Sequence, residues 1–316
     1  MSDDDLIVEW DHSRAGELVA LCGAALPDES VGLDDVEAVC FAGAPSSPDD
    51  MLQVVDLVTL ATASGAGAVT VSVTGVGEHR SAHVQLLVVH PSRRGQGLGR
   101  ALVEAAERWA TDRGLSELTI GGAAPFYLFT GIDTRWTAAI CLLESMGYER
   151  TGAELDLTCP TRRSSTPRDR GAASSERMTE LEVVAVDSDA RAAALMEMAL
   201  RDWPLWSAEF RRAAEAGTVV IARDGVDGPV LGAAAHSVSR FGVIGPVAVS
   251  PDAHGRGIGS ELMAAVLAEL SIAGLRSAEI AWTSTVRFYA KACGATIART
   301  SLLMRRPLVA PSATEQ

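Results

Sequence analysis

The feature that most constrains the fold is a pattern that occurs twice in the chain. Residues 88–100 read VVHPSRRGQGLGR, and residues 248–260 read AVSPDAHGRGIGS. In each copy an apolar strand leads into a proline turn, three glycines on alternate positions and an amphipathic helix. Such a loop presents backbone N–H groups to a phosphate at the N-terminus of the helix. The pattern therefore predicts one anionic ligand site in each half of the chain.

The two copies have a constant offset. Arg94 and His254 are 160 residues apart, and so are Gly114 and Gly274, the glycines that follow the two helices. An equal offset across a strand, a loop and a helix indicates a duplicated domain. A stretch rich in Ser, Arg and Pro lies between the halves and is typical of an exposed linker. We expect an N-terminal domain at 1–159, a linker at 160–179 and a C-terminal domain at 180–316.

Hydrophobic periodicity indicates both strands and helices in each half, which predicts the α/β (α+β) class. In the first half we expect strands at 6–11, 51–60, 68–74, 82–89, 115–120 and 148–157 and helices at 13–26, 34–41, 100–112 and 137–145. In the second half we expect strands at 181–186, 218–223, 230–237 and 241–249 and helices at 190–201, 208–216 and 261–271.

Composition excludes several classes of function. The net charge of −14 argues against non-specific binding of nucleic acid, because a polyanion would be repelled. The chain has no apolar run of the roughly 20 residues that span a bilayer, and its N-terminus is acidic where a signal peptide is basic. We therefore expect a cytoplasmic protein without a membrane partner. Five scattered cysteines give no zinc or redox motif, so no metal site is predicted.

Three kinds of phosphate loop compete for the glycine pattern. A nucleoside triphosphate loop needs Gly-x-x-x-x-Gly-Lys-Ser/Thr, but Lys291 is the only lysine in the chain. A dinucleotide fingerprint needs Gly-x-Gly-x-x-Gly in the first strand-to-helix turn, whereas these loops read Gly-x-Gly-x-Gly and follow several strands. The motifs Arg94-x-x-Gly97-x-Gly99 and His254-x-x-Gly257-x-Gly259 instead resemble the coenzyme A loop of the GNAT-type N-acetyltransferases.

This resemblance covers nearly the whole chain and implies two GNAT domains in tandem, each with a mixed, mostly antiparallel central sheet flanked by helices. It implies acetyl-CoA as the cofactor, with the pantetheine arm along the splayed ends of the strands that finish at Val89 and Val249. His254, in place of the usual Arg or Gln, is expected to remove a side-chain contact and leave the backbone amides. The cofactor-binding residues implied are Leu87, Val88, Val89, Arg94, Gly95, Gln96, Gly97, Leu98, Gly99 and Arg100, and then Val247, Ala248, Val249, His254, Gly255, Arg256, Gly257, Ile258, Gly259 and Ser260.

Acyl transfer from a thioester to an amine needs a proton for the leaving thiolate. In many GNAT enzymes a tyrosine on the helix after the fifth strand supplies it, and the sequence Phe-Tyr-Ala-Lys at 288–291 resembles that motif. Tyr289 is therefore the expected general acid, although Gly294 follows it one residue later than usual. The first half has Leu143 where the tyrosine would be, so it lacks the acid.

Other site residues follow less directly. His236, on a strand that leads to the second site, is a candidate general base, although a lone strand histidine is more often structural. Trp282, Thr283 and Ser284 follow the fifth strand, where the family often places substrate contacts. The first half carries 13 extra residues here, including the aromatic segment 126–133, which would form a substrate wall or pack between the domains.

We expect an acetyl-CoA-dependent N-acetyltransferase that acts on a small-molecule primary amine. Its chemistry is assigned to the C-terminal domain through Tyr289, with an N-terminal domain that binds cofactor and has weak or no activity. One alternative has both domains active, or only the N-terminal one, with water or Asp133 handling protons. Another is a non-catalytic acetyl-CoA sensor or assembly module. No particular oligomeric state is indicated.

Overall fold

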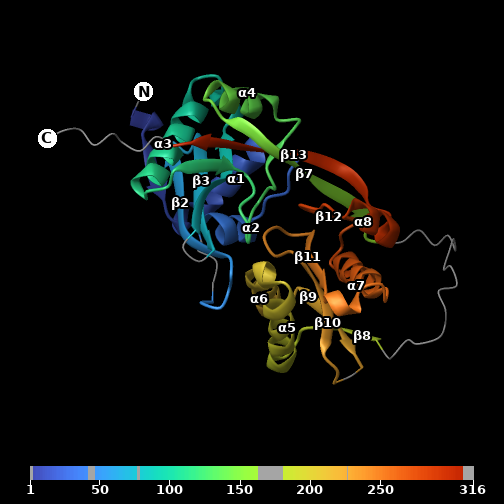
Figure 1. Ribbon diagram of the computed structural model, residues 1–316. Helices are drawn as coiled ribbons and strands as arrows, with labels where there is room; N and C mark the ends of the chain where they lie inside the picture. Colours follow the sequence, from blue (N-terminus) through green and yellow to red (C-terminus); the bar gives the residue numbers. More distant parts are fainter. Residues whose placement is uncertain (1–2, 42–46, 77–78, 163–180, 226, 309–316) are drawn as a thin grey trace. The chain divides into compact units, whose positions relative to one another are not determined.

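The chain folds into two compact units. The computed structural model describes residues 3–41, 47–76, 79–162, 181–225 and 227–308 (Figure 1). One unit comprises Met1–Glu154 and Arg299–Gln316, and the other comprises Leu155–Ala298. Within the described residues no helix is both long and apolar enough to cross a lipid bilayer. Each unit is a sheet with helices on its faces, which confirms the predicted mixed α/β class with mostly antiparallel strands.

The sheet of the first unit begins with an antiparallel series of four strands. β1 (Ile7–Trp10), β2 (Gln53–Thr62), β3 (Gly67–Val76) and β4 (His79–Val89) pair in that order. β4 then pairs in parallel with β5 (Glu117–Ile120). The connection that follows β5 contains one additional short strand, β6 (Ile132–Asp133). In this order β4 pairs with one edge of β5, and the other edge of β5 is open to a further strand.

Helices cover both faces of this sheet. α1 (Ala15–Ala25), α2 (Leu33–Val36) and the π-helical turn Glu37–Phe41 precede β2. α3 (Leu98–Asp112) and α4 (Thr137–Ser145) share one core with β2–β5. The apolar face of α3 is buried in that core, through Leu102, Val103, Ala106 and Trp109. Its helical periodicity is the reason that the sequence predicted this helix almost to its ends.

The second unit repeats the plan. β8 (Leu181–Ala185), β9 (Val219–Asp224), β10 (Val230–His236) and β11 (Val243–Val249) form an antiparallel series, and β11 pairs in parallel with β12 (Ser277–Ile280). α5 (Asp189–Asp202) and α6 (Ser207–Ala216) lie between β8 and β9. α7 (Ile258–Ile272) and α8 (Val286–Cys293) contribute to one core with the strands.

The last strand of each repeat completes the sheet of the other unit. β7 (Glu149–Pro160) leaves the first unit after Glu154, and its residues 157–160 pair antiparallel with β12. β13 (Thr296–Pro307) leaves the second unit after Ala298, and its residues 301–307 pair antiparallel with β6 and β5. The compact units therefore differ from the sequential domains expected at 1–159 and 180–316. The expected linker at 160–179 begins with Pro160, which belongs to β7, and residues 163–179 lie outside the described residues.

Candidate active site

The two glycine loops have the same backbone conformation. Each strand ends at a short 3-10 turn, Pro91–Arg93 or Pro251–Ala253, and the following helix is capped by a left-handed glycine. Gly97 has φ 87° and ψ −8°, and Gly257 has φ 81° and ψ 0°. A Cβ at either position would meet no atom within 4 Å. Glycine is therefore required here by its positive φ, and the space above it is open to a ligand.

The N-termini of α3 and α7 present hydrogen-bond donors. Across the part of the chain that the structure describes, no acceptor is assigned to the backbone N–H groups of residues 95–99 or 255–259. Ser260 differs, because its N–H donates to the Gly257 carbonyl at 3.0 Å. Unpaired N–H groups at the positive end of a helix dipole favour an anion. This geometry supports the anionic ligand site predicted in each half.

The side chains of the two loops divide into anchors and exposed groups. Leu98 and Ile258 are buried and hold the first turn of each helix in the core, and Val88 and Ala248 are buried in the strands that lead into the loops. Leu87, Val89, Val247 and Val249 are half-buried, as are Gly99 and Gly259. The exposed residues of the predicted sets are Arg94, Gly95, Gln96, Gly97, Arg100, His254, Gly255, Arg256, Gly257 and Ser260.

Arg94 and His254 each contact a backbone carbonyl of the strand that leads into the loop. Arg94 Nε donates to the Val89 carbonyl at 3.2 Å, and its guanidinium also donates to the Ala25 carbonyl at 2.8 Å. His254 Nε2 lies 3.0 Å from the Val249 carbonyl, the equivalent acceptor. The predicted loss of a side-chain contact with the cofactor at His254 stays a prediction, because this contact is with the protein's own backbone. Imidazole and guanidinium both reach the carbonyl five residues earlier and tie the loop to its strand.

Each parallel strand pair separates before the glycine loop. β4 and β5 pair only from Ala82 with Leu118 to Val84 with Ile120, and β11 and β12 pair only at Val243 and Ile244. A bulge on β4 at Gln85 and a register shift on β11 before Val247 accompany the separation. The strand ends that lead to the loops thus have one edge without a partner strand among the described residues, as the family resemblance implied.

A cavity of about 60 Å³ lies where β4 and β5 separate. Its walls come from β4, from the connection after β5 and from α4, including Leu87, Phe129, Trp136 and Leu143. Leu26, at the end of α1, lines it as well. The rings of Phe129 and Trp136 pack edge to face, with their centroids 5.3 Å apart. The aromatic segment predicted as a substrate wall or as domain packing therefore forms a wall of this cavity.

Packing against the third glycine of each loop aligns the two halves independently of sequence. A Cβ at Gly99 would lie 3.0 Å from Leu142, and a Cβ at Gly259 would lie 3.0 Å from the Phe288 ring. Leu142 and Phe288 thus occupy equivalent positions on α4 and α8. The next residues, Leu143 and Tyr289, are then equivalent too, although each helix ends at a different distance from its following glycine.

Tyr289 is buried at this equivalent position, with 7% of its surface exposed. Its ring packs edge to face on that of Phe288, with the two centroids 4.8 Å apart. Burial raises the pKa of Tyr289 to about 12, the nearby Cys293 thiol adds to that increase, and hydrogen bonding with Thr285 opposes it. The phenol therefore keeps its proton at neutral pH, which is the state that a proton donor requires.

His236 lies at the end of β10 with both ring nitrogens engaged. Nδ1 is 3.0 Å from the Ser237 hydroxyl, and Nε2 is 3.1 Å from a Glu269 carboxylate oxygen on α7. Only 8% of the residue is exposed. A general base must reach the proton that it removes, so this pairing favours a structural role over the predicted catalytic one.

The predicted substrate segment at 282–284 is held by the exchanged strand β7. The Trp282 N–H donates to the buried Asp156 carboxylate at 2.9 Å, and the Thr283 N–H donates to the Leu155 carbonyl at 3.0 Å. Trp282 has φ 50°, a conformation that a non-glycine residue rarely adopts. The Thr283 hydroxyl lies 3.2 Å from that of Thr285, whereas Ser284 is exposed.

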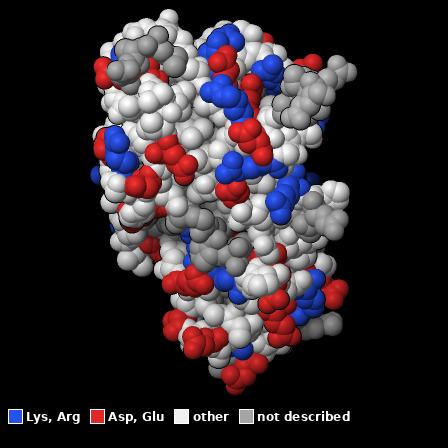
Figure 2. Space-filling model, turned by 90° about the vertical axis from the view of Figure 1, so that its left-hand side faces the viewer, with Lys and Arg blue, Asp and Glu red and all other residues white. Residues whose placement is uncertain are grey.

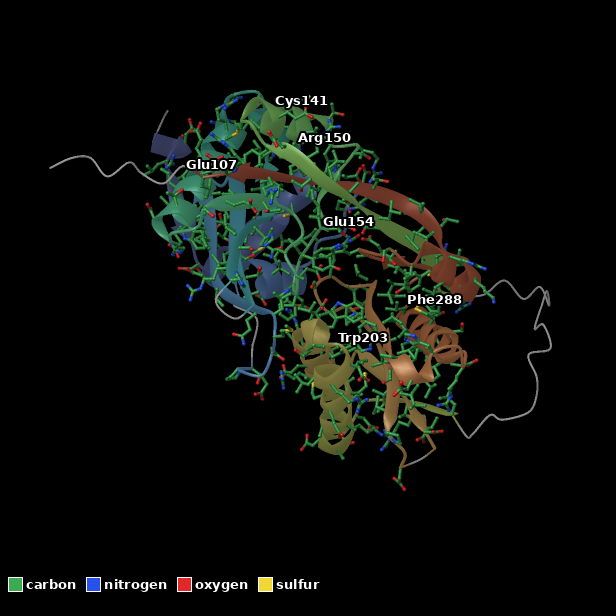
Figure 3. All side chains as sticks on the ribbon, in the orientation of Figure 1. Glu107, Cys141, Arg150, Glu154, Trp203 and Phe288 are labelled. Carbon is green, nitrogen blue, oxygen red and sulfur yellow. The ribbon has the colours of Figure 1, made fainter. Side chains whose placement is uncertain are left out.

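Trp203 has a structural role that sequence reasoning missed. Leu26 and Trp203 are the C-caps of α1 and α5, with φ and ψ of −130° and 63° and of −140° and 53°. Leu26 lines a cavity, whereas Trp203, labelled in Figure 3, stacks on Trp206 with the ring centroids 4.9 Å apart. The Trp203 Nε1–H donates to the Val249 carbonyl at 3.2 Å. The pair of tryptophans after α5, Trp203 and Trp206, was the available signal.

Asp133, the proton carrier in one alternative, belongs to a buried ion cluster. Its carboxylate accepts from Arg135 at 2.6 Å and lies 3.3 Å from Arg299 Nε. Burial acts to raise the pKa of Asp133, but hydrogen bonds from Arg135 and the charge of Arg299 together lower it. Asp133 is thus an anion with 1% of its surface exposed, a poor arrangement for proton exchange with a substrate.

The wider electrostatic setting is mixed. On the face in Figure 2 basic side chains lie among acidic ones instead of forming one continuous patch. Among the described residues no group of three or more His, Cys, Asp and Glu side chains gathers as a metal site. Any attraction for an anionic cofactor therefore comes from the loop amides and nearby arginines, as the overall charge of −14 requires.

Family models match both halves of the chain. Residues 57–150 match the acetyltransferase (GNAT) domain, and residues 192–295 match the acetyltransferase (GNAT) family. Each match spans a glycine loop and the helix that carries Leu143 or Tyr289. No curated protein matches the sequence. The chain belongs to the GNAT acetyltransferase family and carries two of its domains in tandem, which confirms the predicted family and enzyme class.

Solved structures share the fold at low identity. A GCN5-related glucosamine N-acetyltransferase region of a fungal multi-domain GH3 β-N-acetylglucosaminidase has a TM-score of 0.71 at 17% identity, over 95% of this chain. This chain spans only 38% of that one. A tandem GNAT protein from the clavulanic acid biosynthesis pathway has a TM-score of 0.63 at 19% identity and covers 97% of this chain and 99% of its own. A GCN5-related N-acetyltransferase from Sphaerobacter thermophilus has a TM-score of 0.59 at 18% identity and covers 96% and 95%.

Proposed function

We propose that the protein is an acetyl-CoA-dependent N-acetyltransferase for a small primary amine, with its chemistry in the C-terminal domain. In this proposal Tyr289 is the general acid, and the N-terminal domain binds cofactor with weak or no activity. The observation that carries it is the matched packing of Gly99 on Leu142 and of Gly259 on Phe288. That match puts Tyr289 at the position where Leu143 lines the cavity between β4 and β5.

The residues present fit the cofactor in both halves. The open space beside Gly97 and Gly257 and the N–H groups at the start of α3 and α7 suit a pyrophosphate. The free edges of β4 after Val84 and of β11 after Ile244 suit the amides of a pantetheine arm. Acetyl-CoA, when bound, supplies the acyl group as a thioester.

Tyr289 holds the proton that the leaving thiolate needs. Its pKa of about 12 keeps the hydroxyl protonated at neutral pH, and its burial excludes water that would compete for the proton. The equivalent Leu143 carries no proton, so the N-terminal domain lacks this contribution. A positioned general acid typically contributes about 100-fold or more to the rate.

The amine is assigned to the segment that contains Trp282, Thr283 and Ser284. Asp156 and Leu155 hold this segment at the end of β12, so its exposed part is a fixed surface. The net charge of −14 favours cationic amines over acidic molecules as they approach. The amine loses a proton before attack, and His236 is not assigned that step because Ser237 and Glu269 occupy its ring nitrogens.

One observation favours a second candidate, in which turnover takes place in the N-terminal domain. The cavity of about 60 Å³ lies in that domain, at the end of the open edge of β4. Its place suits an acyl group, and water would then protonate the leaving thiolate. Cofactor binding and turnover must therefore be measured separately for each loop.

The experiment uses alanine at the cap glycines with matched controls. Gly97→Ala and Gly257→Ala each put a methyl group beside one helix N-terminus, and Gly114→Ala and Gly274→Ala introduce a Cβ at similar positive φ, 75° and 93°, beyond the ends of the same helices. Coenzyme A binding is followed by calorimetry, and acetyl transfer is followed with a panel of primary amines. The proposal expects each loop variant to lose one binding event and only Gly257→Ala to lose turnover.

The controls separate strain from ligand contact. Alanine at positive φ costs about 1 kcal/mol at all four positions, so equal losses in Gly257→Ala and Gly274→Ala would be an effect of stability alone. Loss of turnover in Gly97→Ala instead of Gly257→Ala would select the second candidate. Coenzyme A binding without acetyl transfer to any amine would favour the sensor or assembly module.

A further inference from the structure

Trp282 has a backbone conformation that a bulky residue rarely adopts. Its φ is 50°, and among the described residues the only other non-glycine residue with a positive φ is Ser237. In this left-handed region a Cβ lies too close to a backbone carbonyl, so the conformation is strained for residues other than glycine. Such strain persists only where the surrounding structure imposes it, and it is common at functional sites. The contacts that impose it on Trp282 therefore point to function.

The equivalent residue of the first unit is Gly122, which adopts the same conformation without strain. Ile120 and Ile280 are the last residues of β5 and β12. Gly122 lies two residues after Ile120, as Trp282 does after Ile280, and its φ is 68°. The Gly122 N–H donates to the Thr130 carbonyl at 2.8 Å, within the connection that is longer in this half. The second unit lacks both the glycine and this longer connection.

A side chain of β7 supplies the acceptor in the second unit. The Trp282 N–H donates to Asp156 Oδ1 at 2.9 Å, and only 2% of Asp156 is exposed. On β7, Asp156 comes just before the residue that pairs with Ile280. On β13, Leu303 comes just before the residue that pairs with Ile120. The carboxylate therefore occurs where the left-handed residue is tryptophan, and an apolar side chain occurs where it is glycine. Because a hydrogen bond to a carboxylate is stronger than one to a carbonyl, Asp156 offsets strain at Trp282.

The turn that Asp156 holds leads from β12 directly into α8 (Figure 1). The Thr283 hydroxyl oxygen accepts the Thr285 N–H at 3.1 Å, and Thr285 is the N-cap of α8. The Thr285 carbonyl accepts the Tyr289 N–H at 3.4 Å, and the Thr285 side chain hydrogen-bonds with that of Tyr289. A displacement of the turn at Trp282 is therefore transmitted to the first turn of α8 and to the Tyr289 side chain.

We propose that Asp156 is a positioning residue for Tyr289, acting through the left-handed turn at Trp282. The carboxylate fixes the backbone from which Tyr289 extends and takes no part in the proton transfer. The functional part of this inference rests on the proposed role of Tyr289 as general acid, whereas the structural part does not. A catalytic group loses much of its effect when it is displaced by about 1 Å, so its support matters to the rate. Since Asp156 lies on β7, the last strand of the first repeat, that repeat supplies part of the site of the second.

The test follows the tyrosine ring signals by NMR and, separately, kcat for acetyl transfer. The chain has only three tyrosines, so a protein isotopically labelled in the tyrosine rings gives a signal for Tyr289 that Tyr289→Phe identifies. We expect Asp156→Leu, which copies the side chain of Leu303, to shift this signal and to lower kcat about 10- to 100-fold. Asp156→Asn keeps an oxygen acceptor for the Trp282 N–H and should retain most of the wild-type kcat.

A second substitution tests whether Asp156 acts through the strained turn. Adding Trp282→Gly to Asp156→Leu recreates the pair of Leu303 and Gly122. It should restore the Tyr289 signal and kcat, because glycine adopts this φ without support. The KM for the amine should stay raised, since Trp282 belongs to the segment assigned to the substrate. Recovery of kcat by a second substitution separates positioning from a general loss of stability.

Thr158→Val is the matched control. It removes a hydrogen bond of 3.2 Å from the same strand to the Ala278 carbonyl on β12, away from the turn, and should leave the Tyr289 signal and kcat unchanged. An unshifted Tyr289 signal in Asp156→Leu overturns the proposal, as does an equal loss of kcat with and without Trp282→Gly. If Asp156→Leu does not fold, Asp156→Ala removes the acceptor without adding bulk and gives the same comparison. An unchanged kcat in Tyr289→Phe would contradict the proposed function instead, and the NMR signal would still report whether Asp156 positions Tyr289.

Discussion

The first prediction concerns the ion cluster that holds β13 in the first unit. Arg299, near the start of β13, donates to both carboxylate oxygens of Glu29 at 2.8 and 2.9 Å and lies 3.3 Å from Asp133. The side chains of Glu29 and Asp133 are 3% and 1% exposed, and that of Arg299 is 12% exposed. Arg299→Met keeps the apolar stem and removes the charge. The variant therefore leaves two buried carboxylates with less positive charge beside them.

Removal of one partner from a buried ion pair typically costs about 3–5 kcal/mol, because the remaining charge loses its compensation. Arg135 still donates to Asp133 at 2.6 Å, so we expect the lower end, about 3 kcal/mol. The matched control is Arg150→Met, which breaks the ion pair between Arg150 and Glu144. These two groups are 2.6 Å apart, and their side chains are 57% and 46% exposed. An exposed pair of this kind contributes less than about 1 kcal/mol.

The assay is equilibrium urea unfolding of the full chain, followed by circular dichroism at pH 7 and repeated at pH 3. The arginines lower the pKa of Asp133 in the folded state, so its contribution is present above its ordinary value of 3.8 and is lost as pH falls through the lowered value. The difference between wild type and Arg299→Met should therefore shrink at pH 3. Equal losses in Arg299→Met and Arg150→Met at pH 7 would refute the reasoning.

Two further predictions concern the second unit. Burial raises the pKa of Glu209 to about 8, so the folded state keeps a proton that the unfolded state loses, and stability should fall by up to about 1.4 kcal/mol per pH unit between pH 5 and 8. Glu209→Gln should remove this fall in urea unfolding, and an unchanged slope contradicts the assignment. Gly259→Ala puts a methyl group 3.0 Å from the stiff ring of Phe288, whereas Gly99→Ala meets a flexible end of Leu142. We expect Gly259→Ala to lose about 1–3 kcal/mol by overpacking and Gly99→Ala less, and the reverse order in thermal unfolding contradicts this packing argument.

Local structure was largely predictable from the sequence, because it depends on patterns within one element. The helix predicted at 137–145 is α4 without any change of boundary, and the two strand, loop and helix segments lie where the repeated motif places them. The positive φ of Gly97 and Gly257 follows from a turn that only glycine readily forms. Each of these elements can be predicted from its own residues alone.

The features that were not predicted depend on contacts between residues that are distant in sequence. Residues 148–157 read as a strand, but nothing in them indicates that β7 continues to Pro160 and pairs with β12 more than a hundred residues later. The contact of Trp203 with the Val249 carbonyl likewise depends on how the chain returns. The contact of Asp156 with the Trp282 N–H is visible only once β7 is placed beside β12.

The central claim is that Tyr289 supplies the proton for acetyl transfer, and one substitution tests it most directly. Tyr289→Phe removes only the hydroxyl, and Tyr148→Phe is the matched control, since Tyr148 is 3% exposed and its hydroxyl donates to Glu107 at 3.0 Å in the first unit. The measurement is kcat for acetyl transfer from acetyl-CoA to an amine that the wild type accepts. We predict a loss of about 100-fold or more in Tyr289→Phe, with coenzyme A binding retained, and little change in Tyr148→Phe. Unchanged kcat in Tyr289→Phe would contradict the assignment of Tyr289 as the acid.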